Sequence, residues 1–169
     1  MEVIKKKRGF TLIELMIVLA IVAILAVVLV PKSQIFKNNS KNAGVTTNVN
    51  TVRAYLETKA SNVGGNTTYL NKAELLNEFK GAFVTGNTSN QLFNPFTNKN
   101  GTGNAYEVID KTNTSLTDNS NEKTVKSHAG LSNPSAVKKG EVIVVVYKNG
   151  YGVVGADSGG SATQAFIVQ

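Results

Sequence analysis

The chain has 169 residues, no cysteine and a formal net charge of +7 at pH 7. This length allows one domain of ordinary size, and the lack of cysteine excludes disulfides, cysteine nucleophiles and thiolate metal sites. Beyond residues 5–8, which are all basic, the basic residues are spread along the chain and do not cluster with the aromatic ones, so nucleic acid is not expected as a partner.

An apolar run begins at Phe10 and continues to Val30, with Thr11 and Glu14 as its only polar residues. As a helix this run would reach about 31 Å, close to the roughly 30 Å hydrocarbon core of a bilayer. The basic residues 5–8 precede it and favour a cytoplasmic N-terminus. The run is longer than that of an ordinary secretory signal and has no A-x-A-like exit, so a membrane-spanning helix is predicted.

Glu14 is the unusual residue of this run, because an acid inside a spanning helix costs about 2.5–3.5 kcal/mol and usually has a partner. If the chain is cut between Gly9 and Phe10, the new α-amino group lies one helical turn before Glu14 on the same face. The amine and the carboxylate can then pair, within one chain or between neighbours, and the helix N-terminus adds a favourable field for the acid. Gly9 suits a peptidase site because it has no side chain.

The segment KRGFTLIELMIVLAIVAILA resembles the leader and N-terminal helix of type IV pilins and related pseudopilins. The family pattern is a short basic leader ending in Gly, followed by Phe-Thr-Leu-Ile/Val-Glu and an apolar helix. The matching residues are Gly9, Phe10, Thr11, Leu12 and Glu14. Pro31 matches the proline that the family places at the end of this stretch.

This resemblance implies a precursor that a membrane-embedded prepilin peptidase cuts after Gly9 and N-methylates at Phe10. An assembly ATPase and a polytopic platform membrane protein would then move the subunit into a homo-oligomeric helical filament. The subunit would start as a single-pass protein of the cytoplasmic membrane and end in an extracellular cell-surface pilus. Thr11 and Glu14 would be its assembly residues, with Glu14 paired to the Phe10 amine of a neighbour. No cofactor, metal or enzymatic activity is expected.

Two residues bear on the integrity of this helix. Pro31 lacks a backbone N–H, which predicts a helix break at the end of the apolar run. Many pilins carry a glycine midway along the helix, and Ala23 stands at that position here. Because alanine is a stronger helix former than glycine, melting between Ala23 and Pro31 stays an open alternative.

Apolar residues recur at helical spacing from Val45 to Leu56, which predicts one helix from about Thr11 to about Asn62, ended by Gly64-Gly65. The expected organisation is a cleaved leader at 1–9, an apolar membrane and filament-core helix at 10–31, an amphipathic helix at 32–62 and a globular head at 63–169.

The rest of the chain predicts an α+β fold, in which the long N-terminal helix packs on an antiparallel sheet of about four strands. The pilin resemblance implies the same architecture. A short helix is expected over Asn71–Lys80 with Asn71 as its cap, and an exposed polar loop over Lys111–Ser127. The expected strands are Ala105–Ile109, Val142–Tyr147, Tyr151–Ala156 and Gln164–Val168, with a type I′ turn at Asn149-Gly150.

Two other motifs have a chemical interpretation that the sequence does not favour. The stretch Ala156–Gly160 is similar to the GDSGG segment of serine proteases, but the single histidine, His128, and the short head cannot form that fold, so a turn around Ser158 is favoured. Acidic side chains that could bind calcium lack EF-hand spacing, so a solvated loop is favoured. These are Asp110, Asp118 and Glu122.

The sequence therefore favours a structural subunit of a type IV pilus that serves adhesion, aggregation, motility or DNA uptake. A pseudopilin of a type II-like secretion or DNA-uptake machine is the first alternative. A membrane-anchored enzyme or receptor is the second. The missing catalytic constellation argues against the enzyme, and Glu14 argues against a simple tether.

Overall fold

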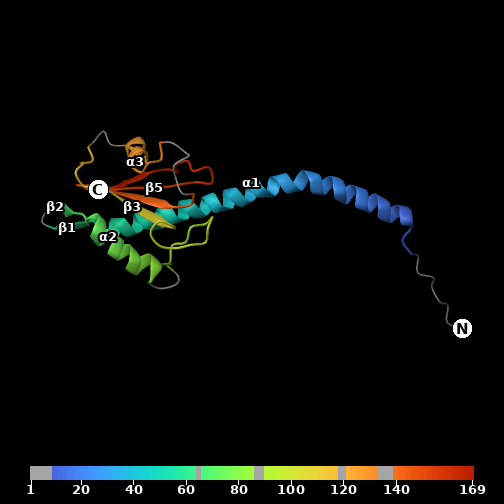
Figure 1. Cartoon of the computed structure of the whole chain (residues 1–169), viewed down its shortest axis with the longest axis horizontal. Coiled ribbons are helices and arrows are strands. Elements are labelled where there is room, and N and C mark those ends of the chain that lie inside the picture. The colour runs from blue at the N-terminus through green and yellow to red at the C-terminus, as the bar shows by residue number, and fades with distance from the viewer. Residues whose placement is uncertain (1–8, 64–65, 86–89, 118–120, 133–138) are drawn as a thin grey trace. The chain divides into compact units, whose positions relative to one another are not determined.

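The structure, a computed structural model, describes residues 9–63, 66–85, 90–117, 121–132 and 139–169. The chain forms two compact units with their boundary between Asn38 and Asn39. The first unit holds the N-terminal part of helix α1 (Leu12–Lys59), and the second holds the rest of α1 and all other described elements (Figure 1).

In the first unit, the apolar side chains of α1 are open to the surroundings. The large apolar residues from Leu12 to Leu29 have exposed fractions between 52% and 77%. This segment is long and apolar enough to cross a membrane. The helix is continuous through Ala23 and Pro31. The break expected at Pro31 is thus absent from the described single chain, and melting within an assembly stays a prediction.

In the second unit, α1 presents one apolar face to the head. Its fully buried side chains are Val45, Val49, Val52 and Leu56, at the predicted helical spacing. The helix ends at Lys59 and does not reach Asn62, because Ser61–Val63 forms strand β1, paired antiparallel with β2 (Asn66–Thr68). Asn, Ser and Val are weaker helix formers, so a hairpin competes well here. Gly64-Gly65 lies outside the described residues.

The head contains a four-stranded sheet of order β3-β4-β5-β6, which agrees with the predicted α+β class. The strands are β3 (Tyr106–Lys111), β4 (Val142–Tyr147), β5 (Gly150–Gly155) and β6 (Phe166–Val168). The antiparallel expectation holds for β4–β5 and β5–β6, but β3 runs parallel to β4, so the sheet is mixed. A parallel pair needs a long crossover, and residues 112–141 supply it.

Both faces of this sheet are covered, which explains why β4 is a continuous apolar run. Val142, Val144 and Val146 belong to the cluster that includes the buried residues of α1. The alternate residues of β4, Ile143 among them, belong to a second cluster with helix α3 (Glu122–His128). Figure 1 shows α3 on one side of the sheet and helix α2 (Lys72–Phe79) on the other. A strand buried on both faces needs no polar alternation.

Two glycines of β5 let helices approach the sheet closely from opposite faces. A Cβ atom at Gly155 would lie 2.6 Å from Cγ1 of Val45 in α1. A Cβ atom at Gly152 would lie 2.7 Å from Cγ1 of Val125 in α3. Real Cβ atoms do not come this close to other atoms, so both contacts require glycine.

Helix α2 confirms the predicted helix and its cap. Asn71 Oδ1 accepts the backbone N–H groups of Ala73 (2.9 Å) and Glu74 (3.1 Å), and Glu74 Oε2 accepts the Asn71 N–H at 2.9 Å. This reciprocal pair is a capping box. The helix continues as a short π-helix, η1 (Lys80–Val84).

The loop expected over Lys111–Ser127 is wrong in its second half, where α3 forms. Asn121 Oδ1 accepts the N–H groups of Lys123 (3.0 Å) and Thr124 (3.2 Å), which caps the helix. Within the helix only Val125 is buried, so the sequence shows almost no apolar periodicity. The residue in the sequence that indicates a helix start here is Asn121, which is a favoured N-cap residue.

The hairpin between β4 and β5 exists, but its turn is not type I′. Tyr147 pairs with Gly150, so the central residues are Lys148 and Asn149. Among the described non-glycine residues only Asn98 has a positive φ, whereas type I′ requires positive φ at both central positions. The Asn149 side chain instead binds the backbone of Leu116: its Oδ1 accepts the Leu116 N–H (2.6 Å) and its Nδ2 donates to the Leu116 carbonyl (2.8 Å).

Candidate functional site

The candidate site lies at the start of α1, where the predicted cleavage point and the predicted assembly residues follow one another. Gly9 and Phe10 precede the helix and have no regular secondary structure. Beyond the chain neighbours of Gly9, no atom of the described residues lies within 4 Å of the position that a Cβ would take there, and Phe10 is 92% exposed. A peptidase binds its substrate as an accessible, non-helical segment, and the peptide bond between these residues meets that requirement.

Thr11 and Glu14 form a capping box at the first turn of α1. Glu14 Oε2 accepts the backbone N–H of Thr11 at 2.8 Å and its hydroxyl at 2.7 Å. In return, Thr11 Oγ1 accepts the backbone N–H of Glu14 at 3.3 Å. Thr-x-x-Glu is the known spacing of this motif, and the two residues satisfy backbone donors that the first helical turn leaves open.

The capping box gives Thr11 a defined role next to Glu14, whereas the resemblance implies only that both are assembly residues. The signal was present in the sequence, because a Thr followed three residues later by Glu before an apolar run marks a helix start. The structure therefore brings together two of the predicted assembly residues. Phe10, which would carry the new amine, is the residue directly before Thr11.

The carboxylate keeps one oxygen for another donor. Within the described contacts, both hydrogen bonds from Thr11 end on Oε2 of Glu14, and no described donor binds Oε1. The carboxylate also lies at the first turn of the helix, where the unpaired N–H groups favour negative charge. A cationic group that approaches this turn can bind Oε1 without displacing Thr11.

The residues considered for catalysis do not come together in the head. Ser158 contacts α1: its N–H donates to Asn42 Oδ1 (2.8 Å) and its Oγ accepts from Asn42 Nδ2 (3.3 Å). His128 Nδ1 lies 2.9 Å from the Tyr147 hydroxyl. Each side chain thus has a structural partner, and the turn interpretation of Ser158 is the one that the contacts support.

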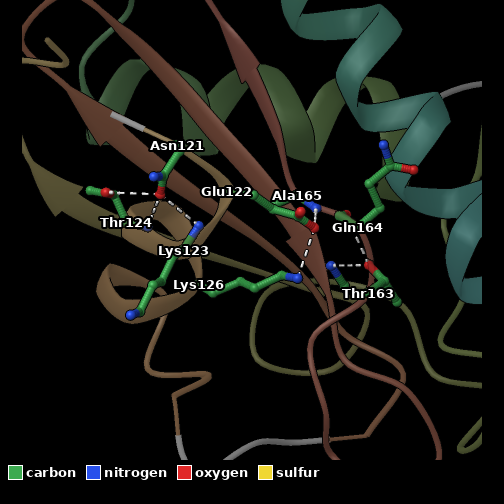
Figure 2. A network of polar contacts seen from close by, with 9 residues as sticks. Asn121, Glu122, Lys123, Thr124, Lys126, Thr163, Gln164 and Ala165 are labelled. Carbon is green, nitrogen blue, oxygen red and sulfur yellow. Dashed lines mark hydrogen bonds and ion pairs between the residues drawn. The ribbon is translucent and has the colours of Figure 1, made fainter. Parts of the chain in front are cut away.

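The acidic residues considered for calcium are also engaged elsewhere. Asp110 Oδ1 accepts the N–H (2.9 Å) and the hydroxyl (2.7 Å) of Thr112, and the backbone hydrogen bond lowers the pKa of Asp110. Glu122 Oε1 accepts Lys126 Nζ (2.7 Å) and the Ala165 N–H (2.8 Å), as Figure 2 shows, and the Lys126 bond is the main cause of its lowered pKa. Asp118 lies outside the described residues. In the described part of the chain, no three His, Asp or Glu residues gather in a metal-binding group.

Comparison with known proteins bears on the N-terminal segment. Residues 4–30 match the family model described as the prokaryotic N-terminal methylation motif. No solved structure matches the chain. The motif implies processing by a prepilin peptidase, and with the apolar helix it supports a membrane-anchored precursor. The motif and the fold indicate a structural protein rather than an enzyme. The chain therefore carries the N-terminal methylation signal of type IV pilin-like and pseudopilin-like precursors, and its long helix and four-stranded sheet fit that pilin-like class.

Proposed function

We propose that this chain is the structural subunit of a type IV pilus filament. The observation that carries the proposal is the start of α1, where a capping box holds a carboxylate at the head of a wholly exposed apolar helix. An apolar helix of this kind needs lipid or other apolar helices around it. A filament replaces the lipid by the same helix of neighbouring copies.

The acid at the head of this helix selects which neighbour can bind. A carboxylate buried among apolar helices is costly unless a positive group pairs with it. Cleavage after Gly9 creates such a group at Phe10, and N-methylation keeps it basic. In this proposal the Phe10 amine of one copy binds Glu14 of another, with Thr11 holding the carboxylate in place.

The proposed route uses the expected organisation of the chain. The leader at 1–9 is removed by the prepilin peptidase, and the apolar helix at 10–31 holds the mature chain in the cytoplasmic membrane. An assembly ATPase and a platform membrane protein then transfer it to the filament. The rest of α1, which ends at Lys59, carries the head to the cell surface, where the filament acts in adhesion, aggregation or motility.

The test follows the mature chain through cell fractionation. Shearing whole cells is expected to release long filaments whose subunit, by mass spectrometry, begins with N-methylated Phe10. Gly9→Val is expected to leave a heavier, uncut chain in the membrane and no filaments, because a branched side chain blocks close approach of the peptidase. Gly81→Ala is a control of the same residue type, since nothing lies within 4 Å of a Cβ at that position.

Two outcomes would contradict the proposal in different ways. A processed chain that is found only in short, cell-associated assemblies would identify a pseudopilin of a secretion or DNA-uptake machine. A chain that keeps its leader and remains entirely in the membrane fraction would refute both filament functions.

A further inference from the structure

Helix α1 carries an unusual group of exposed side chains just beyond the apolar run. Beyond Leu29, three large apolar side chains in the described residues are exposed: Ile35 (59%), Phe36 (67%) and Phe93 (39%). Two of them are neighbours in the sequence, and Lys32 lies one helical turn before them. We call Lys32, Ile35 and Phe36 the juxtamembrane patch.

The three residues share one face of the helix with the apolar run. At about 100° per residue, they fall within an arc of about 120° that also contains Leu29. Gln34 is about 160° from Phe36 and therefore lies on the opposite face. The patch thus extends one apolar stripe past the end of the run, with a lysine inside it.

The height of the patch corresponds to the headgroup layer of a bilayer. The Cα atom of Phe36 lies about 10 Å past that of Leu29 along the helix, which is slightly outside a polar layer about 5–8 Å thick on each side of the hydrocarbon core. Helical side chains point back toward the N-terminus, so the Phe36 ring reaches back toward the membrane. The Lys32 side chain can extend its apolar stem along the helix and place its ammonium among the phosphates.

We propose that the juxtamembrane patch anchors α1 to the lipid headgroup layer, with Ile35 and Phe36 inserted at the interface and Lys32 bound to lipid phosphate. This inference rests on the proposed function, in which the apolar run spans the membrane before assembly. It adds a second contact that fixes the rotation and tilt of the helix in the membrane, because interfacial aromatic and basic anchors set both.

Charge decides between lipid and a second copy of the chain as the occupant of this patch. A buried ammonium needs an acidic partner. The sequence has no Asp or Glu between Glu14 and Glu57, so a second helix lying along the patch offers Lys32 no carboxylate. Lys37, about 140° from Lys32 around the helix, adds a further positive charge at a similar height outside the patch. Lipid phosphates satisfy both lysines.

The lack of tryptophan in the chain allows a direct test. The full chain is reconstituted into vesicles of mixed anionic and zwitterionic phospholipid at low protein density, with one tryptophan introduced by Phe36→Trp. Lipids brominated either near the headgroup or deep in the acyl chain then report the depth of the indole. Leu19→Trp marks the membrane span, and Gln34→Trp is the matched control on the opposite face.

The expected result depends on the face and not on height alone. The indole at position 36 should show blue-shifted emission, and the lipid brominated near the headgroup should quench that emission. The indole at position 34 should stay in water, although it is closer to the apolar run by about 3 Å. In the Phe36→Trp chain, Lys32→Gln should lower the ratio of membrane-facing to water-facing indole about fivefold in anionic vesicles.

Several results would overturn the anchor. Equal quenching at positions 34 and 36, or a water-exposed indole at 36, would refute it while leaving the proposed function intact. Shielding at 36 that appears only at high protein density would assign the patch to a second copy. A Leu19→Trp indole outside the bilayer would refute the membrane precursor, and the anchor with it.

Discussion

Replacing Glu14 by Gln separates the capping role that the structure shows for this side chain from the pairing role that we propose for it. Glu14 Oε2 accepts the Thr11 N–H at 2.8 Å and the Thr11 hydroxyl at 2.7 Å. A Gln carbonyl accepts both bonds equally well, since capping boxes use Glu or Gln at this position. Glu14→Gln therefore keeps the helix start and removes the charge. Glu14→Ala removes both.

The two roles differ in size. Loss of a capping interaction costs about 0.5–2 kcal/mol. Removal of the acid from a buried pair leaves the Phe10 amine of the neighbour uncompensated, which costs roughly 3–5 kcal/mol, or a factor of at least a hundred in each docking equilibrium. If pairing drives assembly, the two variants should be almost equally defective.

The assay compares sheared filaments with the processed membrane pool by quantitative immunoblot, together with the mass of the mature chain. We expect both Glu14 variants to be cut after Gly9 and both to lose filament yield by about a hundredfold or more. Thr11→Ser, which keeps a capping hydroxyl, is the control and should assemble. Normal filament yield from Glu14→Gln, with failure of Glu14→Ala, would refute charge pairing and leave capping as the only function of Glu14.

Three further predictions concern the head. Gly155→Ala should lower the free energy of unfolding by about 1–3 kcal/mol, because the new methyl would lie 2.6 Å from Val45 Cγ1. Thermal unfolding of the full chain in detergent measures this loss of stability. Asn149→Ala should lower it by about 1–3 kcal/mol and raise hydrogen exchange around Leu116, because it leaves that backbone N–H and carbonyl unsatisfied. Burial raises the pKa of Tyr147 from 10.0 to about 12. The stability that the buried, neutral phenol contributes is therefore complete below pH 10 and falls as the pH rises toward 12. Tyr147→Phe should reduce this alkaline loss of stability, which denaturant titrations at several pH values measure.

Each of these predictions has a control and a contrary result. Gly81→Ala, at an open position, should leave the unfolding temperature unchanged, and an equal loss at both glycines would deny the close approach of α1. For Asn149→Ala, hydrogen exchange that rises uniformly along the chain, and not near Leu116, would mean that the Asn149 side chain does not stabilise the Leu116 backbone locally. For Tyr147, an unchanged alkaline slope in the Phe variant would assign that loss to other groups.

The features predicted best from the sequence are those whose signal is carried by many residues in a row. The apolar run predicted the first part of α1, and the spacing from Val45 to Leu56 predicted its buried face. The β-branched run at Val142–Tyr147 predicted β4. In each case a long repetition of one residue class leaves few alternative structures.

The features that the sequence missed depend on single residues or on distant contacts. Helix α3 has one buried side chain, Val125, and takes its position from contacts that the sequence does not display, such as Glu122 with the Ala165 N–H. The turn at Asn149 has the composition of a type I′ turn, but its side chain binds Leu116, far away in the chain. The parallel pairing of β3 with β4 joins strands that are far apart in the chain, and local patterns do not encode it.

The candidate site shows the same division. The cleavage point after Gly9 and the pairing role of Glu14 come from motif and charge, and they stay predictions. The capping box was not predicted, although Thr11 and Glu14 stand at its spacing in the sequence. A local motif that spans four residues was thus within reach of the sequence.

The hydrogen bonds at the start of α1 have a consequence for the timing of maturation. The Thr11 N–H that Glu14 accepts is an amide both before and after cleavage, because Phe10 remains attached to it. We therefore expect the first turn of the helix to be the same in the precursor and in the mature chain. In the proposed processing, proteolysis alters only the charge in front of that turn, because it removes the basic leader and adds an amine. A subunit cut after Gly9 is then expected to be competent for docking with no refolding step in between.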